Sequence, residues 1–527
     1  MVINGGFYPT IQNSLEGSLT AGVNSTVTIL PVDHCDYYIP KDWVYTDVSA
    51  VNPVLAVVGY DSTDYTYPET VKIIGISAAT GAGNLTVTRG IGGTATAGNA
   101  RSWLSGDKVA VVLTSQHIYQ MQNTLANLGY QQGIGVEWDT TSNSPTLSYV
   151  DQSGNTITPT ATDFANSPIW GAMRRCNVAD DGTVNAWYGD SDFAYDGSNG
   201  QVMVWIPAFY YASAQVDNDD HIRWVTSSYY QTGFKIHPAF VTDSRQIPGF
   251  YWGALEGCVY DVSEAAYVTD DYVVAGDVVD FNADKLSSIA GVKPVSGNVI
   301  SLSRANARKL AENRGAGWQQ IDFNQVSALQ MLFMVRYGTL NSQGIFEGVT
   351  DLASGTGNES INTGYTAGVG TGSSDLGNTS GEVSVLATQP FSFYGIENFY
   401  GNIYKWVDGI NIIDNVPWIA DHGYVDDSFA DPYVDTALTL SNANGYVSAI
   451  KFDQVNDHTF LASAVLGSDS TYLCDYYYQA AGTRVALFGG SWDGGANAGA
   501  FYWSLFYAAS YVHRRVGARL AFIPQVK

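Results

Sequence analysis

The sequence predicts an α+β fold, in which a β-rich N-terminal region precedes a larger domain with two helices and short antiparallel strands. Alternating apolar runs bounded by glycine-rich turns favour strands between residues 54 and 113. Two later segments carry helix-capping residues around apolar positions of helical spacing. The composition agrees, because the 527 residues include 55 Gly and 35 Tyr while only 14 % are charged, which is typical of short strands joined by tight turns.

The first 135 residues are predicted to form three parts. Residues 1–53 mix turn signals with apolar runs, and we expect an irregular N-terminal arm there. Residues 54–114 are expected to form a small β-domain. Its strand-like runs are residues 54–58, 71–76, 85–88 and 109–113. Residues 115–128 have helical spacing, which predicts a helical linker over residues 115–135 that either joins subunits or packs on its own domain.

Residues 136–527 are expected to form one large domain. Within it, residues 201–211 predict a buried strand that ends at Pro207, because proline cannot donate to a sheet ladder. Residues 353–383 are rich in Gly, Ser, Thr and Asn and contain hardly any apolar residues. That composition predicts a surface insertion without regular structure.

Two helices are predicted in the middle of this domain. The first begins after the N-cap Ser303 and ends at Gly315. The second begins at a capping box made by Asp322 and Gln325 and ends at Gly338. One face of the second helix is predicted to carry Val326, Leu329, Leu332, Phe333 and Arg336.

The chain is strongly acidic, with a formal net charge of −26 and a pI near 4.3. This charge argues against nucleic acid as a partner and against an electrostatic contact with a membrane. No apolar run is long enough to span a bilayer, and the first twelve residues show no signal peptide. We expect free, buried thiols and synthesis in a reducing compartment, because the cysteines lie far apart at Cys35, Cys176, Cys258 and Cys474.

Two motifs near the C-terminus indicate the fold of the large domain. Residues 395–409 read GIENFYGNIYKWVDG, in which Gly401 permits a turn with positive φ and Asn402 can bridge backbone groups in that turn. Further on, the chain reads GGSW from Gly489 and VGARLA from Val516. These motifs resemble elements of the formylglycine-generating-enzyme-like branch of C-type-lectin folds. The resemblance implies a C-type-lectin-like domain.

Residues 491–515 combine small and aromatic side chains without a helical or strand period. They resemble the variable region of proteins diversified by diversity-generating retroelements, in which adenines of AAC codons are randomised. The resemblance implies a ligand-binding surface made of Ser491, Asp493, Ser504, Phe506, Tyr507, Ser510, Tyr511, His513 and Arg515. None of these is Lys, Glu, Gln, Met or Trp, which changes in the first two bases of AAC cannot produce. Trp492, Phe501 and Trp503 are expected to be structural.

Residues 85–112 also resemble an N-terminal module of phage tail and fibre proteins. Together these resemblances imply a non-enzymatic receptor-binding protein of a phage tail tip or fibre, made in the host cytoplasm and located on the virion tail. The implied partners are other tail proteins and a host surface receptor, either protein or glycan. The resemblances also imply a homotrimer, and no cofactor is expected.

Enzymatic alternatives find less support in the sequence. A formylglycine-generating oxidase needs two nearby cysteines to hold copper, and only Cys474 lies near the C-terminus. Phe488 and Ala518 also replace an arginine and an aromatic residue of that family. The seven histidines form no pair at the spacing of a helical metal site. A glycosidase would need a pair of catalytic carboxylates, such as Asp219–Asp220. With 50 acidic residues some such pairs are inevitable, so they do not indicate this activity.

Two further expectations remain open in the sequence. A purely structural tail or baseplate protein agrees with the N-terminal module, and that role does not exclude ligand binding. Residues 180–181 and 426–427 offer carboxylates to calcium, but no EF-hand spacing supports a calcium site.

Overall fold

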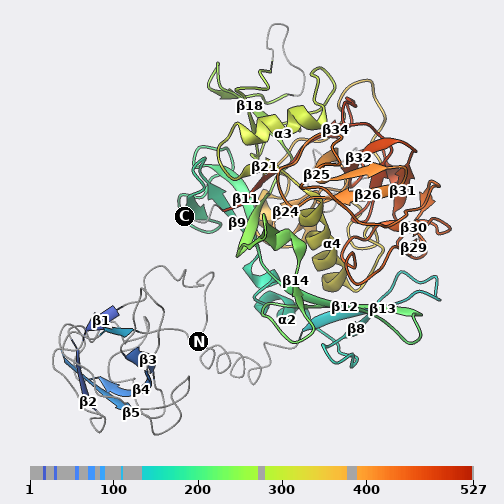
Figure 1. Ribbon diagram of the computed structural model, residues 1–527. Helices are drawn as coiled ribbons and strands as arrows, with labels where there is room; N and C mark the ends of the chain where they lie inside the picture. Colours follow the sequence, from blue (N-terminus) through green and yellow to red (C-terminus); the bar gives the residue numbers. More distant parts are fainter. Residues whose placement is uncertain are drawn as a thin grey trace. The chain divides into compact units, whose positions relative to one another are not determined.

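The computed structural model describes residues 133–270, 279–376 and 389–524, together with the backbone of six strands in the N-terminal region (Figure 1). The chain divides into two compact units, residues 1–131 and 132–527. This boundary falls inside the predicted linker over residues 115–135. The helix predicted at residues 115–128 lies outside the described residues.

The N-terminal unit contains one six-stranded antiparallel sheet, with strand order β1-β6-β3-β4-β5-β2. Its strands are β1 (Glu16–Ser18), β2 (Ile29–Val32), β3 (Val54–Val58), β4 (Glu69–Ile76), β5 (Gly83–Thr88) and β6 (Lys108–Ala110). Three of the four runs predicted between residues 54 and 113 therefore lie within strands, and the fourth, residues 109–113, overlaps β6 at 109–110 while its remaining residues lie outside the described ones. The prediction of a separate irregular arm over residues 1–53 is wrong for β1 and β2, which pair with β6 and β5. These two short strands satisfy backbone groups at both edges of the sheet.

The second unit is β-rich and contains three larger sheets. The first has the order β10-β9-β11-β17-β35-β21, the second β14-β12-β13-β7-β8, and the third β27-β26-β25-β32-β33-β31-β28 with β34 beside β25. The predicted strand is β11 (Gln201–Pro207), which lies in the middle of the first sheet and ends at Pro207 as expected.

The strands of these sheets have the following bounds: β7 Ile134–Asp139, β8 Ser148–Val150, β9 Arg174–Val178, β10 Val184–Trp187, β12 Tyr210–Val216, β13 His221–Ser227, β14 Lys235–Ile236, β17 Gly249–Gly253, β21 Trp318–Gln320, β25 Tyr404–Ile413, β26 Val416–Ile419, β27 Val434–Asp435, β28 Gly445–Tyr446, β31 Tyr476–Gln479, β32 Thr483–Phe488, β33 Trp503–Leu505, β34 Val516–Gly517 and β35 Leu520–Phe522. Smaller elements are β15 Val241–Thr242, β16 Arg245–Gln246, β18 Cys258–Asp261, β19 Ala266–Tyr267, β20 Lys285–Ser287, β22 Ser374–Asp375, β23 Phe391–Phe393, β24 Ile396–Glu397, β29 Ala449–Ile450, β30 Ala462–Ala464, α2 Ala161–Asn166, η3 Trp170–Ala172, η4 Pro238–Phe240, η5 Ala367–Val369 and η6 Gly495–Asn497.

Both predicted helices are present. The Ser303 side chain accepts a hydrogen bond from a backbone N–H in the first turn of α3 (Arg304–Glu312), which ends at Asn313, two residues before the predicted Gly315. The capping box of Asp322 and Gln325 starts α4 (Phe323–Tyr337), and Gly338 ends it with a φ of 60°.

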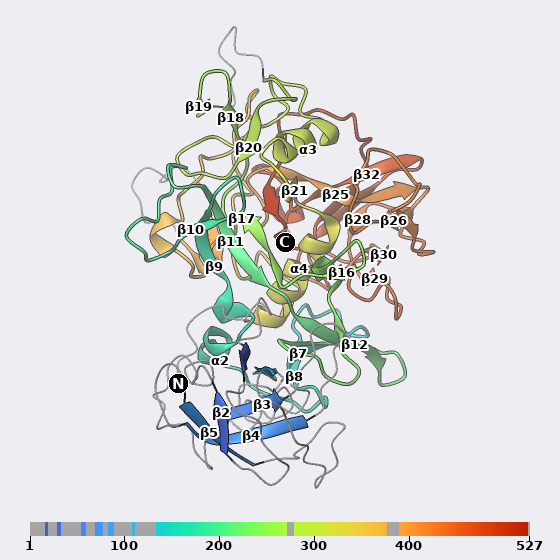
Figure 2. The same ribbon diagram turned by 60° about the vertical axis from the view of Figure 1, so that its left-hand side comes forward.

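The helix α4 differs from its prediction, because residues 323–335 are buried on all sides rather than along one face. Figure 2 shows α4 running through the middle of the second unit, where the packed sheets surround it. Among the described helices, none has the length and apolar character of a membrane span.

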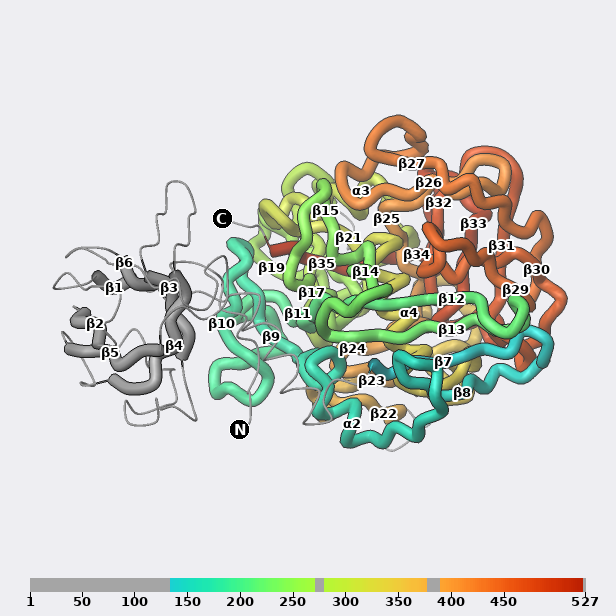
Figure 3. The backbone as a smooth tube through the Cα atoms, turned by 60° about the horizontal axis from the view of Figure 1, so that its bottom comes forward, coloured from blue at the N-terminus to red at the C-terminus, as the bar shows by residue number. Residues whose placement is uncertain are grey.

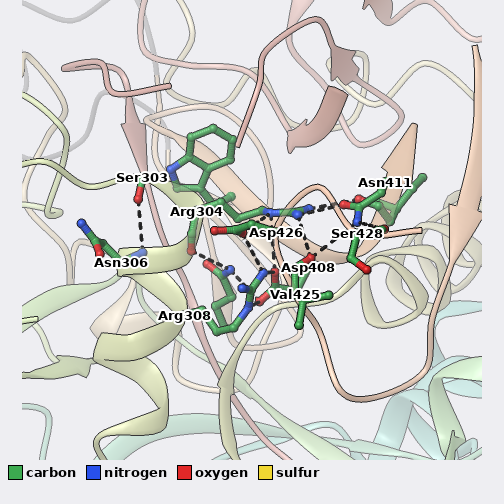
Figure 4. Close-up of polar contacts among 12 residues, drawn as sticks. Ser303, Arg304, Asn306, Arg308, Asp408, Asn411, Val425, Asp426 and Ser428 are labelled. Carbon is green, nitrogen blue, oxygen red and sulfur yellow. Dashed lines mark hydrogen bonds and ion pairs between the residues drawn. The ribbon is translucent and has the colours of Figure 1, made fainter. Parts of the chain in front are cut away.

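Buried ion pairs join α3 to β25 (Figure 4). On α3, Arg308 donates to both carboxylate oxygens of Asp408, one of them at 2.9 Å, and Arg304 donates to Asn411 at 2.8 Å. Asp426 lies 3.3 and 3.2 Å from the same two arginines. The fully buried Asp408 is thus neutralised by charge-assisted hydrogen bonds, as a carboxylate without solvent requires.

The predicted surface insertion at residues 353–383 is only partly right, because its described residues, 353–376, include buried residues among a majority of exposed or half-buried ones. Asn358, Ser360, Thr363 and Thr366 are each less than 5 % exposed. The backbone N–H of Thr366 donates to the carboxylate of Glu397 at 2.7 Å. Polar residues can enter an interior when each finds a partner, so a polar composition did not mean a surface position.

Lys405 and Glu256 form a buried ion pair at the centre of the second unit. Lys405 Nζ lies 3.1 Å from Glu256 Oε1, and both side chains are fully buried. Asn402 donates to the other oxygen of Glu256, and Lys405 also donates to the carbonyl of Gly401 at 2.9 Å. Arg519 donates to the carbonyls of residues 253 and 397 at 2.8 and 2.7 Å. The two sequence motifs therefore meet in one polar network.

The three described cysteines, Cys176, Cys258 and Cys474, are free and buried. This confirms the prediction for these three, while Cys35 lies outside the described residues. Burial raises the pKa of the Cys258 thiol to about 12, so this thiol is uncharged at neutral pH.

Replacing Lys405 with Met should lower the free energy of unfolding by about 3–5 kcal/mol, because it removes the nearer of the two cations beside the buried Glu256 carboxylate and leaves only Arg519, 3.9 Å away. The matched control is Lys309→Met, at an exposed position of α3, where we expect a change within about 0.5 kcal/mol. Denaturant unfolding of both variants measures the difference. Equal stabilities would show that the Lys405–Glu256 pair does not stabilise the fold.

Candidate ligand-binding surface

The C-terminal segment, residues 491–515, is woven into the third sheet. It contains η6 and β33, and β33 pairs antiparallel with β32 and parallel with β31. Figure 3 shows β32, β33 and β31 side by side. The segment therefore crosses the sheet interior before its last ten residues, 506–515, which contain no strand.

Side chains from the rest of the domain hold the backbone in the first half of the C-terminal segment. Gln343 donates to two carbonyl oxygens in and after η6, at 2.9 and 2.6 Å. Gln330 of α4 donates to the carbonyl of Ala500 at 2.8 Å. The buried carboxylate of Asp475 accepts from the N–H of Phe501 at 2.7 Å. None of these bonds involves a side chain of the segment itself.

The backbone of the second half is also held by groups outside the segment. Here they are backbone N–H groups of other elements, which donate to carbonyl oxygens of the segment. The donor and acceptor pairs are Val485 with Tyr507 at 2.9 Å, Arg304 with Ala509 at 3.2 Å, Gly297 with His513 at 3.1 Å and Tyr404 with Arg515 at 2.9 Å. Backbone bonds of this kind do not depend on which side chain the segment carries at these positions.

Large apolar side chains of the segment fill the core beneath it. Trp492, Phe501 and Trp503 are at most 1 % exposed, which confirms that they are structural. Trp503 packs against Phe323 of α4 and Phe488 of β32, with ring centroids 5.3 and 5.4 Å apart. Such rings each bury a large apolar area and fix the segment on the sheet.

The predicted ligand-binding positions divide into accessible and buried ones. Phe506 is 42 % exposed and Ser510 is exposed. Tyr507, Tyr511, His513 and Arg515 are half-buried. The prediction is wrong for Ser491 and Ser504, because they are 1 % and 2 % exposed and a ligand cannot reach them. Asp493 is nearly covered as well, and its carboxylate is paired with Arg515.

The reason for the two buried serines lies in their local structure. Ser504 stands in the middle of the three-residue strand β33, between two neighbouring strands. Ser491 instead donates a hydrogen bond to Asp493 at 2.9 Å. The burial of these two serines could not be predicted from the composition of the segment.

The accessible aromatic side chains of the segment contact one another. The ring centroids of Phe506 and Tyr507 lie 5.2 Å apart, and those of Tyr507 and Tyr511 lie 3.8 Å apart with planes at 16°. His513 continues the stack 5.8 Å from Tyr511, with planes at 12°. Tyr507 and Tyr511 also pack against the core cluster below them, so these side chains lie in a defined arrangement.

The pKa shifts of His513 and Tyr511 both favour the uncharged form of the side chain. Burial and the nearby Arg515 and Arg514 lower the pKa of His513, which favours the neutral imidazole. Burial and the hydrogen bond to Tyr507 raise the pKa of Tyr511. The surface therefore offers phenol and imidazole groups for hydrogen bonding, beside the paired charges of Arg515 and Asp493.

Partly accessible tyrosines also lie next to the C-terminal segment, and they were not among the predicted site residues. Tyr446, Tyr476 and Tyr478 are half-buried, whereas Tyr477 between the last two is 1 % exposed. Alternation within a tyrosine run in a strand was the signal that could have identified them.

Among the described residues, one group has its ligand atoms close enough together to hold a metal ion: Glu137, Asp217 and His221. Local sequence spacing does not indicate this group, because Glu137 reaches His221 only through the pairing of β7 with β13. Glu137 accepts two hydrogen bonds from Arg223, at 2.9 and 2.7 Å, and one ring nitrogen of His221 lies 2.8 Å away. The hydrogen bond with Glu137 raises the pKa of His221, which favours the protonated form that cannot bind a metal. The carboxylates of this group are thus partnered by His221 and Arg223 in an ion-pair network.

The acidic loops considered for calcium also have cationic partners. Asp180 lies 2.8 Å from Lys285 and is paired with Arg314. Asp426 lies 3.2 Å from Arg308. These carboxylates are neutralised within the protein.

Replacing Tyr511 with Ser should cost about 1–2 kcal/mol of stability, because it removes one stacked ring from a partly exposed site. Replacing Trp503 with Ala should cost about 3–5 kcal/mol, because it leaves a cavity in the core. Ser510→Ala, at an exposed position, is the control and should change little. Thermal and denaturant unfolding measure all three. A Tyr511→Ser variant as unstable as Trp503→Ala would show that Tyr511 serves the core rather than the surface.

No protein family matches the sequence, and no curated protein matches it. The chain resembles solved structures titled Major Tropism Determinant. The U1 variant is 13 % identical, with 72 % of this chain and 81 % of that chain covered and a TM-score of 0.24. The P3c variant is 12 % identical, with 88 % and 94 % covered and a TM-score of 0.22. Such low TM-scores do not establish a shared fold.

Proposed function

We propose that the chain is an adhesin of a phage tail whose C-terminal segment binds a ligand on the host cell surface. The observation that carries this proposal is the separation of roles within residues 491–515. The backbone is held by groups outside the segment, and buried tryptophans anchor it. The side chains of Phe506, Tyr507, Ser510, Tyr511 and His513 remain accessible.

This separation suits a surface that changes its ligand. Altering a core side chain costs about 2–5 kcal/mol, whereas a surface change usually stays within about 0.5 kcal/mol. A binding site that varies must therefore keep its varying side chains out of the core. Tyrosine is suited to such a site, because it supplies a large contact area and a hydroxyl group at a low cost in conformational entropy.

The motif resemblances add a fold and a location to the proposal. We assign residues 136–527 to a C-type-lectin-like domain, since residues 395–409 and the VGARLA motif come together in the network around Lys405 and Arg519. The N-terminal unit attaches the chain to other tail proteins, in line with the resemblance of residues 85–112. The proposal includes no cofactor.

An oxidase with copper-binding cysteines is disfavoured by the state of the thiols. Metal-binding and reactive cysteines act as thiolates, which need a lowered pKa. Burial raises the pKa of Cys474 to about 12. Within the described part of the chain, the cysteines are buried and none is paired with another.

Binding of the purified chain to a panel of bacterial strains tests the proposed function. Phe506→Ser and Tyr507→Ser should each weaken binding to the recognised strain about tenfold or more, because accessible aromatic residues carry much of the energy of an interface. Tyr230→Ser is the matched control, since Tyr230 is 59 % exposed and lies outside the C-terminal segment. Unchanged binding of both segment variants would contradict the proposal.

We also propose that the chain is a homotrimer, because linked copies raise the effective concentration of a weak site at a cell surface. Light scattering at micromolar concentration should give three times the monomer mass of 56.7 kDa. A monomer under these conditions would remove this part of the proposal.

A further inference from the structure

Three tyrosines outside the C-terminal segment form a row on the same sheet. Tyr446 of β28 pairs with Tyr476 of β31, and their ring centroids are 5.0 Å apart. Tyr476 and Tyr478 follow at 4.6 Å. Because side chains alternate along a strand, Tyr476 and Tyr478 share one face while Tyr477 points into the core.

This tyrosine row adjoins the C-terminal segment. Tyr478 lies opposite Ser504 in the parallel pairing of β31 with β33. Its ring centroid is 6.1 Å from that of Tyr502, and its hydroxyl oxygen accepts a hydrogen bond from Asn497 at 3.5 Å. The row therefore adjoins the segment at the partly exposed Asn497 and at the buried Tyr502 and Ser504.

The rings in the tyrosine row are arranged differently from the stack of Tyr507, Tyr511 and His513. In the stack, the ring planes lie within 16° of each other, so neighbours cover each other's faces. In the row, the planes of Tyr446 and Tyr476 meet at 79° and those of Tyr476 and Tyr478 at 40°. Tilted, half-buried rings leave part of each face uncovered by the next ring.

The polar groups near the row include amides and the carboxylate of Asp469. Asn442 and Asn444 are exposed, Asn444 accepts from the backbone N–H of Gln479 at 2.8 Å, and Gln479 donates to the carbonyl of Asn442. Burial and the carboxylate of Asp469 raise the pKa of Tyr446. The charge that acts on this end of the row is thus negative, in a chain with a net charge of −26. Anionic ligands are disfavoured here by like charge.

We propose that Tyr446, Tyr476 and Tyr478 form a second subsite that binds an uncharged glycan chain beside the C-terminal segment. A sugar ring has an apolar C–H face, which packs on an aromatic face, and hydroxyl groups, which both donate and accept hydrogen bonds. The tyrosine faces supply the first contact and the amides the second. This inference rests on the proposed function and names the class of ligand.

An array of uncharged oligosaccharides, built from hexoses, deoxyhexoses and N-acetylhexosamines, tests the proposal with the full chain. The chain should bind at least one member, and Tyr476→Ala and Tyr478→Ala should each weaken that binding about tenfold or more. Tyr230→Ala, an exposed tyrosine of another part of the domain, should leave it unchanged. Melting curves of the variants check that all remain folded.

The outcomes separate this proposal from the proposed function. Absence of binding across the array, while the chain still binds cells, overturns the glycan subsite and leaves the adhesin function intact. Glycan binding that Tyr507→Ser abolishes but Tyr476→Ala and Tyr478→Ala do not overturns the subsite as well. Cell binding that protease treatment of the cells removes, with no glycan bound, assigns the surface to a protein partner and also overturns it.

Discussion

The buried pair of Lys405 and Glu256 is the interaction on which the arrangement of the second unit depends. It connects the strand β25, the turn at Asn402 and the loop after β17, and Arg519 extends the same network to the C-terminal strand β35. Burying two charges costs free energy that only close partners offset. An alternative packing would leave one of these charges alone in the interior, so the network selects one arrangement of these four segments rather than only adding stability.

The proposed binding surface depends on this network because the C-terminal segment is attached to it at both ends. The N–H of Trp492 donates to the carbonyl of Asn402 at 3.0 Å, and the segment runs into β34, which pairs with β25. Between these points, groups of α4 and of the neighbouring loops hold the backbone. A rigid interior thus holds the backbone of an accessible loop in place, which is a common arrangement for loops that carry function.

Much of this architecture could be predicted from local sequence, and the failures have a physical pattern. Ser303, the box of Asp322 and Gln325, and Gly338 act within one helical turn, so their roles are visible in a few residues. Ser504 and Thr366 are buried because of partners far away in the chain, which composition does not reveal. The tyrosine row was missed for a related reason, since only strand pairing brings Tyr446 beside Tyr476.

The stack of Tyr507, Tyr511 and His513 limits how the surface can evolve. Residues in direct contact show interaction energies of about 0.5–3 kcal/mol, so the effect of a change at one ring depends on which residues occupy the other two positions. If these positions vary as proposed, the number of workable surfaces is therefore smaller than the product of independent choices at each position. A replacement of Tyr511 should therefore tend to occur together with a compatible residue at position 507 or 513, and natural alleles would then show linked substitutions at these positions.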